Sequence, residues 1–203
     1  MMLRLSYQFT LGLVSAITVS APCAAQDRIE HKAAGITIDR PAGWHDLSLA
    51  QVQANREHVR LADPELQHAM STQSTMPLLS FTKYEEPHAG LNPTIQLGLR
   101  PLVPGAPTEV LEIALQTMRR VYADFRLIAP VQAVQVAGWP AAHASATYTL
   151  RNDRGESFDV KGRLWLVPRG RLMFLIAMSG TQTGEDVCES EFQAVISTLT
   201  INP

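Results

Sequence analysis

Two segments near the middle of the chain alternate apolar and polar residues with a period of two. In the first, residues 78–84, Leu79 and Phe81 alternate with Ser80 and Thr82. In the second, residues 94–100, Ile95, Leu97 and Leu99 alternate with polar residues or Gly. The 87–93 segment between them is rich in Pro, His, Gly and Asn, which are typical of loops. This pattern predicts two strands joined as a hairpin.

Four further strands are predicted in the second half, where short turn signals separate apolar or alternating runs. Residues 172–178 are continuously apolar, which is typical of a central strand covered on both faces. Along the preceding strand, alternate residues from Phe158 to Leu166 are apolar or Gly, and we expect the opposite face to contact water. The four predicted strands span residues 130–137, 142–150, 158–166 and 172–178.

The helical signals surround these strands. Thr108 is a plausible N-cap for a helix whose apolar stripe runs to Phe125, and an amphipathic stripe from Cys188 to Leu199 follows a start signal at Thr183. Ser48 and Gln51 have the spacing of a capping box, which predicts a polar helix to about Leu61. A second short helix from Asp63-Pro64 and a first strand over residues 33–39 complete the pattern. Neighbouring strands with short turns predict an α+β domain, with a mainly antiparallel sheet packed against helices.

The first 25 residues have the pattern of a secretory signal peptide. Arg4 precedes an apolar stretch of about a dozen residues, which is shorter than the ~20 residues of a membrane-spanning helix. Cys23 and Ala25 suit the small-residue positions before a cleavage site, so we expect a single mature domain over residues 26–203. Lipid attachment at Cys23 is the less favoured alternative. We therefore expect a periplasmic or secreted protein without a transmembrane span in its mature chain.

The composition and the net charge limit the classes of partner that the protein is expected to bind. The chain of 203 residues is 46% hydrophobic and 18% charged, which is enough apolar material for a packed core. Removal of Arg4 leaves 16 of the 17 basic residues against 19 acidic ones, a net charge of −3. Without a basic run, nucleic acid is disfavoured as a partner. Cleavage also leaves Cys188 as the one thiol, for which we favour a buried apolar role over a reactive one.

The chain resembles the PsbP-like superfamily in its sparse landmarks. These are the first strand running into Pro41-x-Gly43-Trp44, the long central helix, Gly138-Trp139-Pro140-Ala141 followed by Tyr148, the 162–166 strand, the apolar 172–178 strand and the closing helix that ends at Leu199. The resemblance implies an α-β-α sandwich around an antiparallel sheet, used mainly for docking to other proteins. The metal-binding residues of some relatives have no matching motif here, so none is carried over.

Common catalytic motifs are absent from the sequence. Ser179-Gly180 follows a strong strand, but Ala177 and Thr181 stand where a nucleophile elbow needs Gly. No His-Glu-x-x-His, Cys-x-x-Cys, Walker loop or Gly-x-Gly-x-x-Gly pattern occurs, and no two His have the i, i+4 spacing of helical metal ligands. We therefore predict neither an enzyme nor a cofactor.

Two groups of residues remain as candidate sites. Trp165, Lys161 and Arg163 share the polar face of one strand, and an aromatic residue beside Arg is typical of protein interfaces, so we expect a partner-binding site there. Glu85, Glu86 and His88 are a weaker candidate for a ligand or metal site. Trp44 and Trp139 each follow a Gly at a turn, and we expect them to fill one end of the sandwich.

These observations favour an exported, non-catalytic accessory or protein-interaction module of the cell envelope, whose partner is another envelope protein. The alternative is a periplasmic protein that binds a small ligand or a metal in a pocket between the sheet and the first helices. An enzyme with an unusual site is the third and least favoured interpretation.

Overall fold

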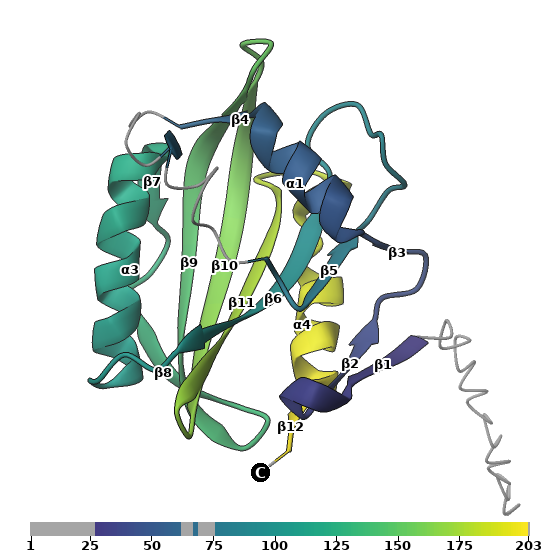
Figure 1. Cartoon of the computed structure of the whole chain (residues 1–203). Helices are drawn as coiled ribbons and strands as arrows, with labels where there is room; N and C mark the ends of the chain where they lie inside the picture. The colour runs from purple at the N-terminus through teal and green to yellow at the C-terminus, as the bar shows by residue number, and fades with distance from the viewer. Residues whose placement is uncertain (1–26, 62–66, 69–75, 203) are drawn as a thin grey trace, which may run out of the picture.

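The computed structural model describes residues 27–61, 67–68 and 76–202 (Figure 1). The predicted signal peptide, the alternative lipidation site Cys23 and the start of the predicted helix at Asp63-Pro64 lie outside these residues. None of the described helices is long and apolar enough to cross a membrane. In chain order the described elements are β1 (Asp27–His31), the 3-10 turn η1 (Lys32–Ala34), β2 (Ile36–Arg40), β3 (His45–Asp46), α1 (Leu49–His58), β4 (Val59–Arg60), β5 (Leu79–Thr82), β6 (Thr94–Pro101), α3 (Pro107–Val121), β7 (Ala123–Leu127), β8 (Gln132–Val136), β9 (Trp139–Asn152), β10 (Ser157–Arg169), β11 (Leu172–Thr181), the 3-10 turn η2 (Glu185–Val187), α4 (Glu189–Thr198) and β12 (Thr200–Ile201).

A large antiparallel sheet forms the middle layer. Its main path runs β3-β5-β6-β11-β10-β9-β4, and β7 and β8 pair with other stretches of β9. The predicted β5–β6 hairpin is confirmed, with Leu79 opposite Leu97. The central position predicted for the 172–178 strand is also confirmed, because β11 pairs with both β6 and β10.

Helices cover both faces of this sheet. Figure 1 shows α1 and α3 in front of the strands and α4 behind them. Under α3, Leu111 and Leu115 pack with Ala142, Ala144 and Leu166. Under α4, Phe192 and Val195 belong to a second buried cluster that includes Phe174 and Ile176 of β11. The predicted α+β class and α-β-α layering are thus confirmed.

A small second sheet was not predicted. It has the order β1-β2-β12 and joins the two ends of the described chain beside α4. β1 is mostly exposed and rich in charged residues, so it has no apolar alternation, while β12 has only two residues. The first predicted strand starts at Ile36 instead of Ala33, because residues 32–34 form a 3-10 turn that Gly35 ends with a positive φ of 64°.

The helix boundaries show where tertiary contacts override the sequence pattern. The capping box at Ser48 and Gln51 is confirmed. α3 is capped at Ala106, not Thr108, and ends at Val121, before the predicted Phe125. The next residues pair with β9 as β7. The closing helix begins at Glu189, because Cys188 adopts a left-handed conformation that separates η2 from α4.

Candidate functional site

The predicted exposure of the Trp165 face of β10 is wrong. Trp165 is only 7% exposed and belongs to the core under α4, and Arg163 is 4% exposed. The alternation along β10 is real, but α4 and the turn before it cover the polar face. Trp165 therefore packs inside the molecule and presents no free surface to a partner.

The charged residues of this face form ion pairs with a carboxylate of the same chain. Arg163 donates from Nε to Glu189 Oε1 at 3.0 Å and from Nη2 to Glu189 Oε2, and Lys161 Nζ lies 2.9 Å from the same Oε2. The guanidinium of Arg163 also lies 5.0 Å from the ring centre of Phe192. Its buried Nη1 makes no hydrogen bond within the described residues. We call Lys161, Arg163, Trp165 and Glu189 the Arg163 cluster.

Two titratable groups show the electrostatics of this cluster. The hydrogen bond from Arg163, followed by that from Lys161, lowers the pKa of Glu189 to about 2. The ring of His143 stacks on Trp165 with centroids 4.6 Å apart, and burial, followed by the charge of Arg163, lowers its pKa. Glu189 is therefore ionised at neutral pH, and it pairs with both Lys161 and Arg163.

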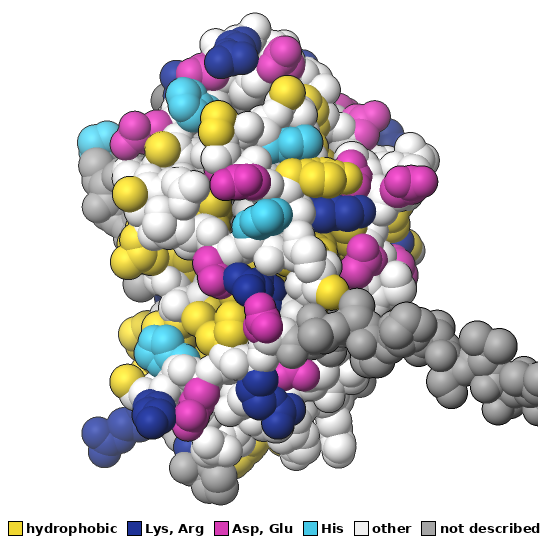
Figure 2. Space-filling model, turned by 90° about the vertical axis from the view of Figure 1, so that its right-hand side faces the viewer, with side chains coloured by type: hydrophobic (Ala, Val, Ile, Leu, Met, Phe, Trp, Pro, Cys, Tyr) yellow, Lys and Arg dark blue, Asp and Glu magenta, His cyan; other side chains and the backbone are white. Residues whose placement is uncertain are grey.

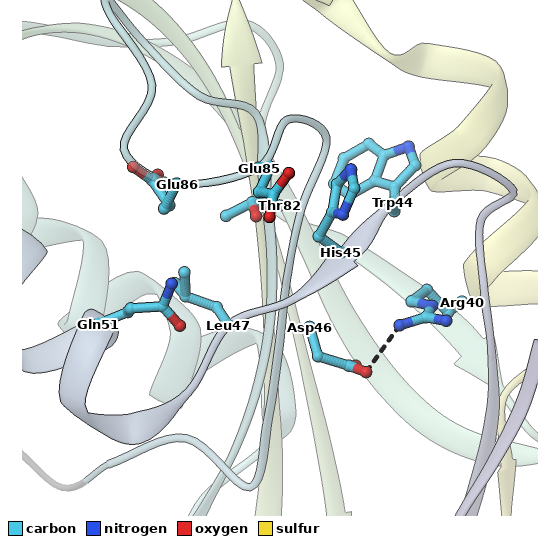
Figure 3. Close-up of a pocket in the computed structure, with 9 residues that line it drawn as sticks. All are labelled: Arg40, Trp44, His45, Asp46, Leu47, Gln51, Thr82, Glu85 and Glu86. Atoms are coloured by element: carbon cyan, nitrogen blue, oxygen red, sulfur yellow. Dashed lines mark hydrogen bonds and ion pairs between the residues drawn. The ribbon is translucent and has the colours of Figure 1, made fainter.

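A different group of polar residues surrounds a surface pocket between β3, β5 and α1. Its volume is about 270 Å³. The lining residues come from the β2–β3 corner, the start of α1, the end of β5 and the loop after it: Arg40, Trp44, His45, Asp46, Leu47, Gln51, Thr82, Glu85 and Glu86 (Figure 3). We call this the β3 pocket. It occupies the space that the sequence suggested for a ligand, between the sheet and the first helix.

The β3 pocket carries more acidic than basic residues, and a buried Thr is among the residues that line it. Arg40 is the one Lys or Arg among its lining residues, and its Nη1 lies 2.7 Å from Asp46 Oδ2. Thr82 is 1% exposed, and its hydroxyl has no hydrogen-bond partner among the described residues. His45 lies directly opposite Thr82 in the β3–β5 pairing, so their side chains project from the same face of the sheet.

The structure brings together only part of the predicted Glu85, Glu86 and His88 group. Glu85 and Glu86 line the β3 pocket. The carboxylate of Glu86 already accepts hydrogen bonds from the backbone of His88 and from Asn92, both at 2.9 Å. The ring of His88 stacks on Tyr84 with centroids 4.6 Å apart. Within the described part of the chain, no three His, Cys, Asp or Glu residues are grouped closely enough to hold a metal ion.

The other aromatic and thiol side chains singled out from the sequence, those of Trp44, Trp139 and Cys188, pack in the core or against it. Trp44 is buried and meets Phe192 edge to face, while the partly buried Trp139 donates from Nε1 to the backbone oxygen of Ile201. Trp44 is part of the core under α4, and Trp139 packs against that core. Cys188 is buried, and burial raises the pKa of its thiol to about 11. The expected burial of Cys188 is confirmed, because the residue is 2% exposed and belongs to the core under α4.

An exposed apolar patch lies where β6 ends and β11 begins. Leu102, Val103 and Leu172 are 40%, 43% and 42% exposed. Pairing of Pro101 with Leu172, and a hydrogen bond from Leu102 N to Arg171 O at 2.9 Å, hold the two segments side by side. We call these three residues the end patch. The β10–β11 turn that carries it is at the lower end of the sheet in Figure 1.

The side of the molecule with β3 and the loop after β5 has a different surface. In Figure 2, acidic, basic and His side chains are interspersed across it. The sequence pattern missed Thr82, His45 and Asp46 as pocket residues because β3 has only two residues and gives no strand signal. The end patch had a signal, since Leu102 and Val103 stand among Pro and Gly residues in a segment without a helical or strand pattern.

Comparison with known proteins establishes the fold. No protein-family model matches this chain, and no curated protein matches it. LpqN of Mycobacterium tuberculosis is similar in structure, with a TM-score of 0.55 at 14% identity over 88% of this chain and 91% of its own. The cyanobacterial PsbP of Synechocystis sp. PCC 6803 has a TM-score of 0.53 at 13% identity over 94% and 99%. The Ran-binding protein Mog1p of Saccharomyces cerevisiae has a TM-score of 0.50 at 11% identity over 88% and 96%. The chain therefore has a PsbP-like fold.

Proposed function

We propose that this protein is an exported, non-catalytic accessory module of the cell envelope, which binds another envelope protein through the end patch. Its fold is shared with LpqN, a protein involved in cell envelope biogenesis, and with cyanobacterial PsbP. Folds host many functions, so this likeness supports the proposal only by analogy. The end patch is the observation that carries it.

The end patch differs from the other exposed hydrophobic residues because its three members lie in two segments that are held side by side. Leu49 lies on α1, Ile113 on α3 and Ile128 after β7, so each is on a separate element. Isolated exposed apolar residues are normal on protein surfaces, whereas a group of them indicates an interaction site. In the end patch, two apolar residues of one loop stand beside a third from the neighbouring turn.

The charges beside the end patch indicate the chemistry of the partner. Arg171 directly precedes Leu172, and Arg169 pairs with Leu172 across the β10–β11 turn. Neither Arg has an ion pair within the described residues. Arg next to exposed apolar side chains is typical of protein interfaces. We infer a partner whose contact surface is apolar at its centre and carries carboxylates at its edge.

The test compares the full chain with a Leu102→Asp, Leu172→Asp double variant in the native envelope. Both are expressed with a photoreactive residue at Val103, and cross-linked products are identified by mass spectrometry. The proposal predicts one dominant adduct that disappears in the double variant. Matched Ile113→Asp, which places the same charge at an exposed apolar residue on α3, should retain the adduct. Unfolding curves of all variants serve as the folding control.

Two outcomes would overturn the proposal. One is an adduct that survives the double variant unchanged, which would show that contact at Val103 does not depend on the patch. The other is the absence of any dominant adduct from the wild-type chain while it remains folded in the envelope.

A further inference from the structure

We propose that β8 is a dimerisation edge, along which a second copy of this chain pairs in antiparallel register and continues the large sheet. The inference goes beyond the partner binding proposed above, because β8 shares no residue with the end patch. It rests on backbone groups that have no partner, on a strand without charge, and on the symmetry of that strand.

The backbone of β8 pairs with a neighbouring strand on one side only. β8 joins β9 through a turn of two residues, Ala137 and Gly138, whose φ values of 51° and 80° are those of a tight hairpin. Such a turn is closed by a hydrogen-bonded pair, which the register places at Val136 and Trp139. Bonded and non-bonded pairs then alternate along an antiparallel ladder. Every second residue of β8, counted from Gln135, therefore turns its N–H and C=O groups away from β9.

These outward residues are Ala133 and Gln135, and both are exposed. Pro140 stands opposite Gln135 and has no N–H, which agrees with a position where β9 donates nothing to β8. Among the described strands β8 pairs with β9 alone, and no hydrogen bond from the other described residues reaches the backbone of Ala133 or Gln135. Two N–H and two C=O groups at one sheet edge are thus left to water or to a further strand.

β8 also lacks the features that normally protect a sheet edge against pairing, namely charged residues, Pro and very short length. No charged residue occurs between Arg126 and His143. The other described edge strands differ from β8. β1 and β7 carry both Asp and Arg, β3 and β4 have two residues of which one is charged, and β12 has two residues. β8 is thus an edge that a neutral strand joins without burying a charge.

The symmetry of β8 identifies a second copy as the occupant, because a two-fold interface needs a surface that is complementary to itself. With the axis beside Val134, Ala133 of each copy stands opposite Gln135 of the other, and their outward groups form four backbone hydrogen bonds. Val134 then meets Val134 of the second copy, and its partly buried side chain already packs against the core under α4. No like charges stand opposite each other in this register. The dimer joins the two large sheets and continues the apolar core across the axis.

The oligomeric state of the purified full chain tests the inference. Sedimentation velocity over roughly a hundredfold range of concentration should show a monomer that gives way to a dimer, as mass action requires. Gln135→Pro removes one outward N–H from each copy and leaves the ladder with β9 intact, because that N–H does not face β9. The variant should raise the dissociation constant of the dimer about tenfold or more, the loss expected from two backbone hydrogen bonds.

Two controls accompany this comparison. Leu172→Asp, in the end patch, should leave the dissociation constant of the dimer unchanged. This result separates the β8 edge from the surface proposed for the envelope partner. Denaturant unfolding of Gln135→Pro shows whether the variant still folds as a monomer.

A disulfide tests the register without relying on the Pro variant. In the proposed register the two Val134 residues form a non-hydrogen-bonded pair with Cα atoms about 4.5 Å apart, which is within the range that a disulfide bridges. Val134→Cys should therefore form a covalent dimer when it is oxidised with glutathione disulfide. Ile128→Cys, at an exposed residue shortly before β8, should stay monomeric, because the register places the two copies of residue 128 roughly 40 Å apart.

Four results would overturn the inference. They are a monomer at every concentration, a dissociation constant that is unchanged in a folded Gln135→Pro variant, the absence of a covalent dimer from Val134→Cys, and covalent dimers that form equally from both Cys variants. A dimer that is lost in Leu172→Asp and kept in Gln135→Pro would overturn it too, because the contact would then lie at the end patch.

Discussion

The Arg163 cluster and the β3 pocket contain similar residue types, but their carboxylates differ in whether they pair with other residues of the chain. In the Arg163 cluster, two cations from β10 meet the carboxylate of Glu189 at the start of α4. In the β3 pocket, the hydroxyl of Thr82 and the carboxylate of Glu85 have no partner within the described residues. The carboxylate of Glu189 is thus paired within the chain, whereas the exposed carboxylate of Glu85 has no ion pair or hydrogen bond within the described residues.

This difference shows that a mixture of aromatic and charged residues is not by itself a binding site. Lys161, Arg163 and Trp165 have the composition of an interface, yet they form part of the protein's own packing. The deciding feature is whether a later element of the same chain supplies the opposite charge. Four mutational and pH tests of this difference follow, from the largest expected change in stability to the smallest.

The largest effect is expected from Trp165→Ala. Removing a buried aromatic side chain from the core costs about 3–5 kcal/mol of unfolding free energy, because the cavity collapses only partly. Denaturant unfolding of the two proteins measures this loss. A variant as stable as the wild type would show that Trp165 lies on the surface, as the sequence pattern first suggested.

A smaller loss is expected from Glu189→Gln, which leaves Arg163 buried without its anionic partner. Because Glu189 is 62% exposed, solvent screens much of the interaction, and we expect a loss of about 1–2 kcal/mol at neutral pH. Glu191→Gln, in the same first turn of α4, is the matched control, since Glu191 does not contact Arg163. Equal losses in the two variants would contradict the specific role of Glu189.

The pH dependence of stability tests the same ion pair without a change of size. The pKa of Glu189 is lowered in the folded state from 4.5 to about 2, so its contribution is present above pH 4.5 and is lost as the pH falls toward about 2. Unfolding free energies measured across this range should fall less steeply for Glu189→Gln than for the wild type. Parallel curves would contradict the lowered pKa.

The smallest change has the opposite sign. Thr82→Val replaces an unpartnered buried hydroxyl by a methyl group of similar shape, so we expect the ligand-free protein to become more stable by about 1 kcal/mol. Thermal unfolding of the ligand-free proteins measures the difference. Destabilisation would indicate that the hydroxyl is satisfied within the protein.

Much of the fold could be predicted from the sequence, because the elements with strong local patterns form where their patterns place them. The capping box at Ser48 and the apolar run from Leu172 to Met178 are examples. The small sheet could not be predicted in this way. β12 is only two residues long and is held by pairing with β2, which lies more than 160 residues earlier.

The candidate sites were less predictable, because they too depend on contacts between segments that are far apart in the sequence. A period of two shows that Arg163 and Leu164 point to opposite faces of β10, but it does not show that α4 covers the polar one. Glu85 was identified from its local sequence, whereas its neighbour Thr82 reads as an ordinary strand residue. The pairing of Thr82 with His45, from a two-residue strand, creates the pocket wall.

The most direct test of the contrast between the paired and the unpaired carboxylate compares the unfolding free energies of Glu189→Gln and Glu85→Gln with that of the wild type. We predict that Glu189→Gln lowers the unfolding free energy by about 1–2 kcal/mol, because it leaves the buried Arg163 without its anionic partner. Glu85→Gln should keep the unfolding free energy within about 0.5 kcal/mol of the wild type. The contrast would be contradicted by equal losses in the two variants, or by a larger loss in Glu85→Gln.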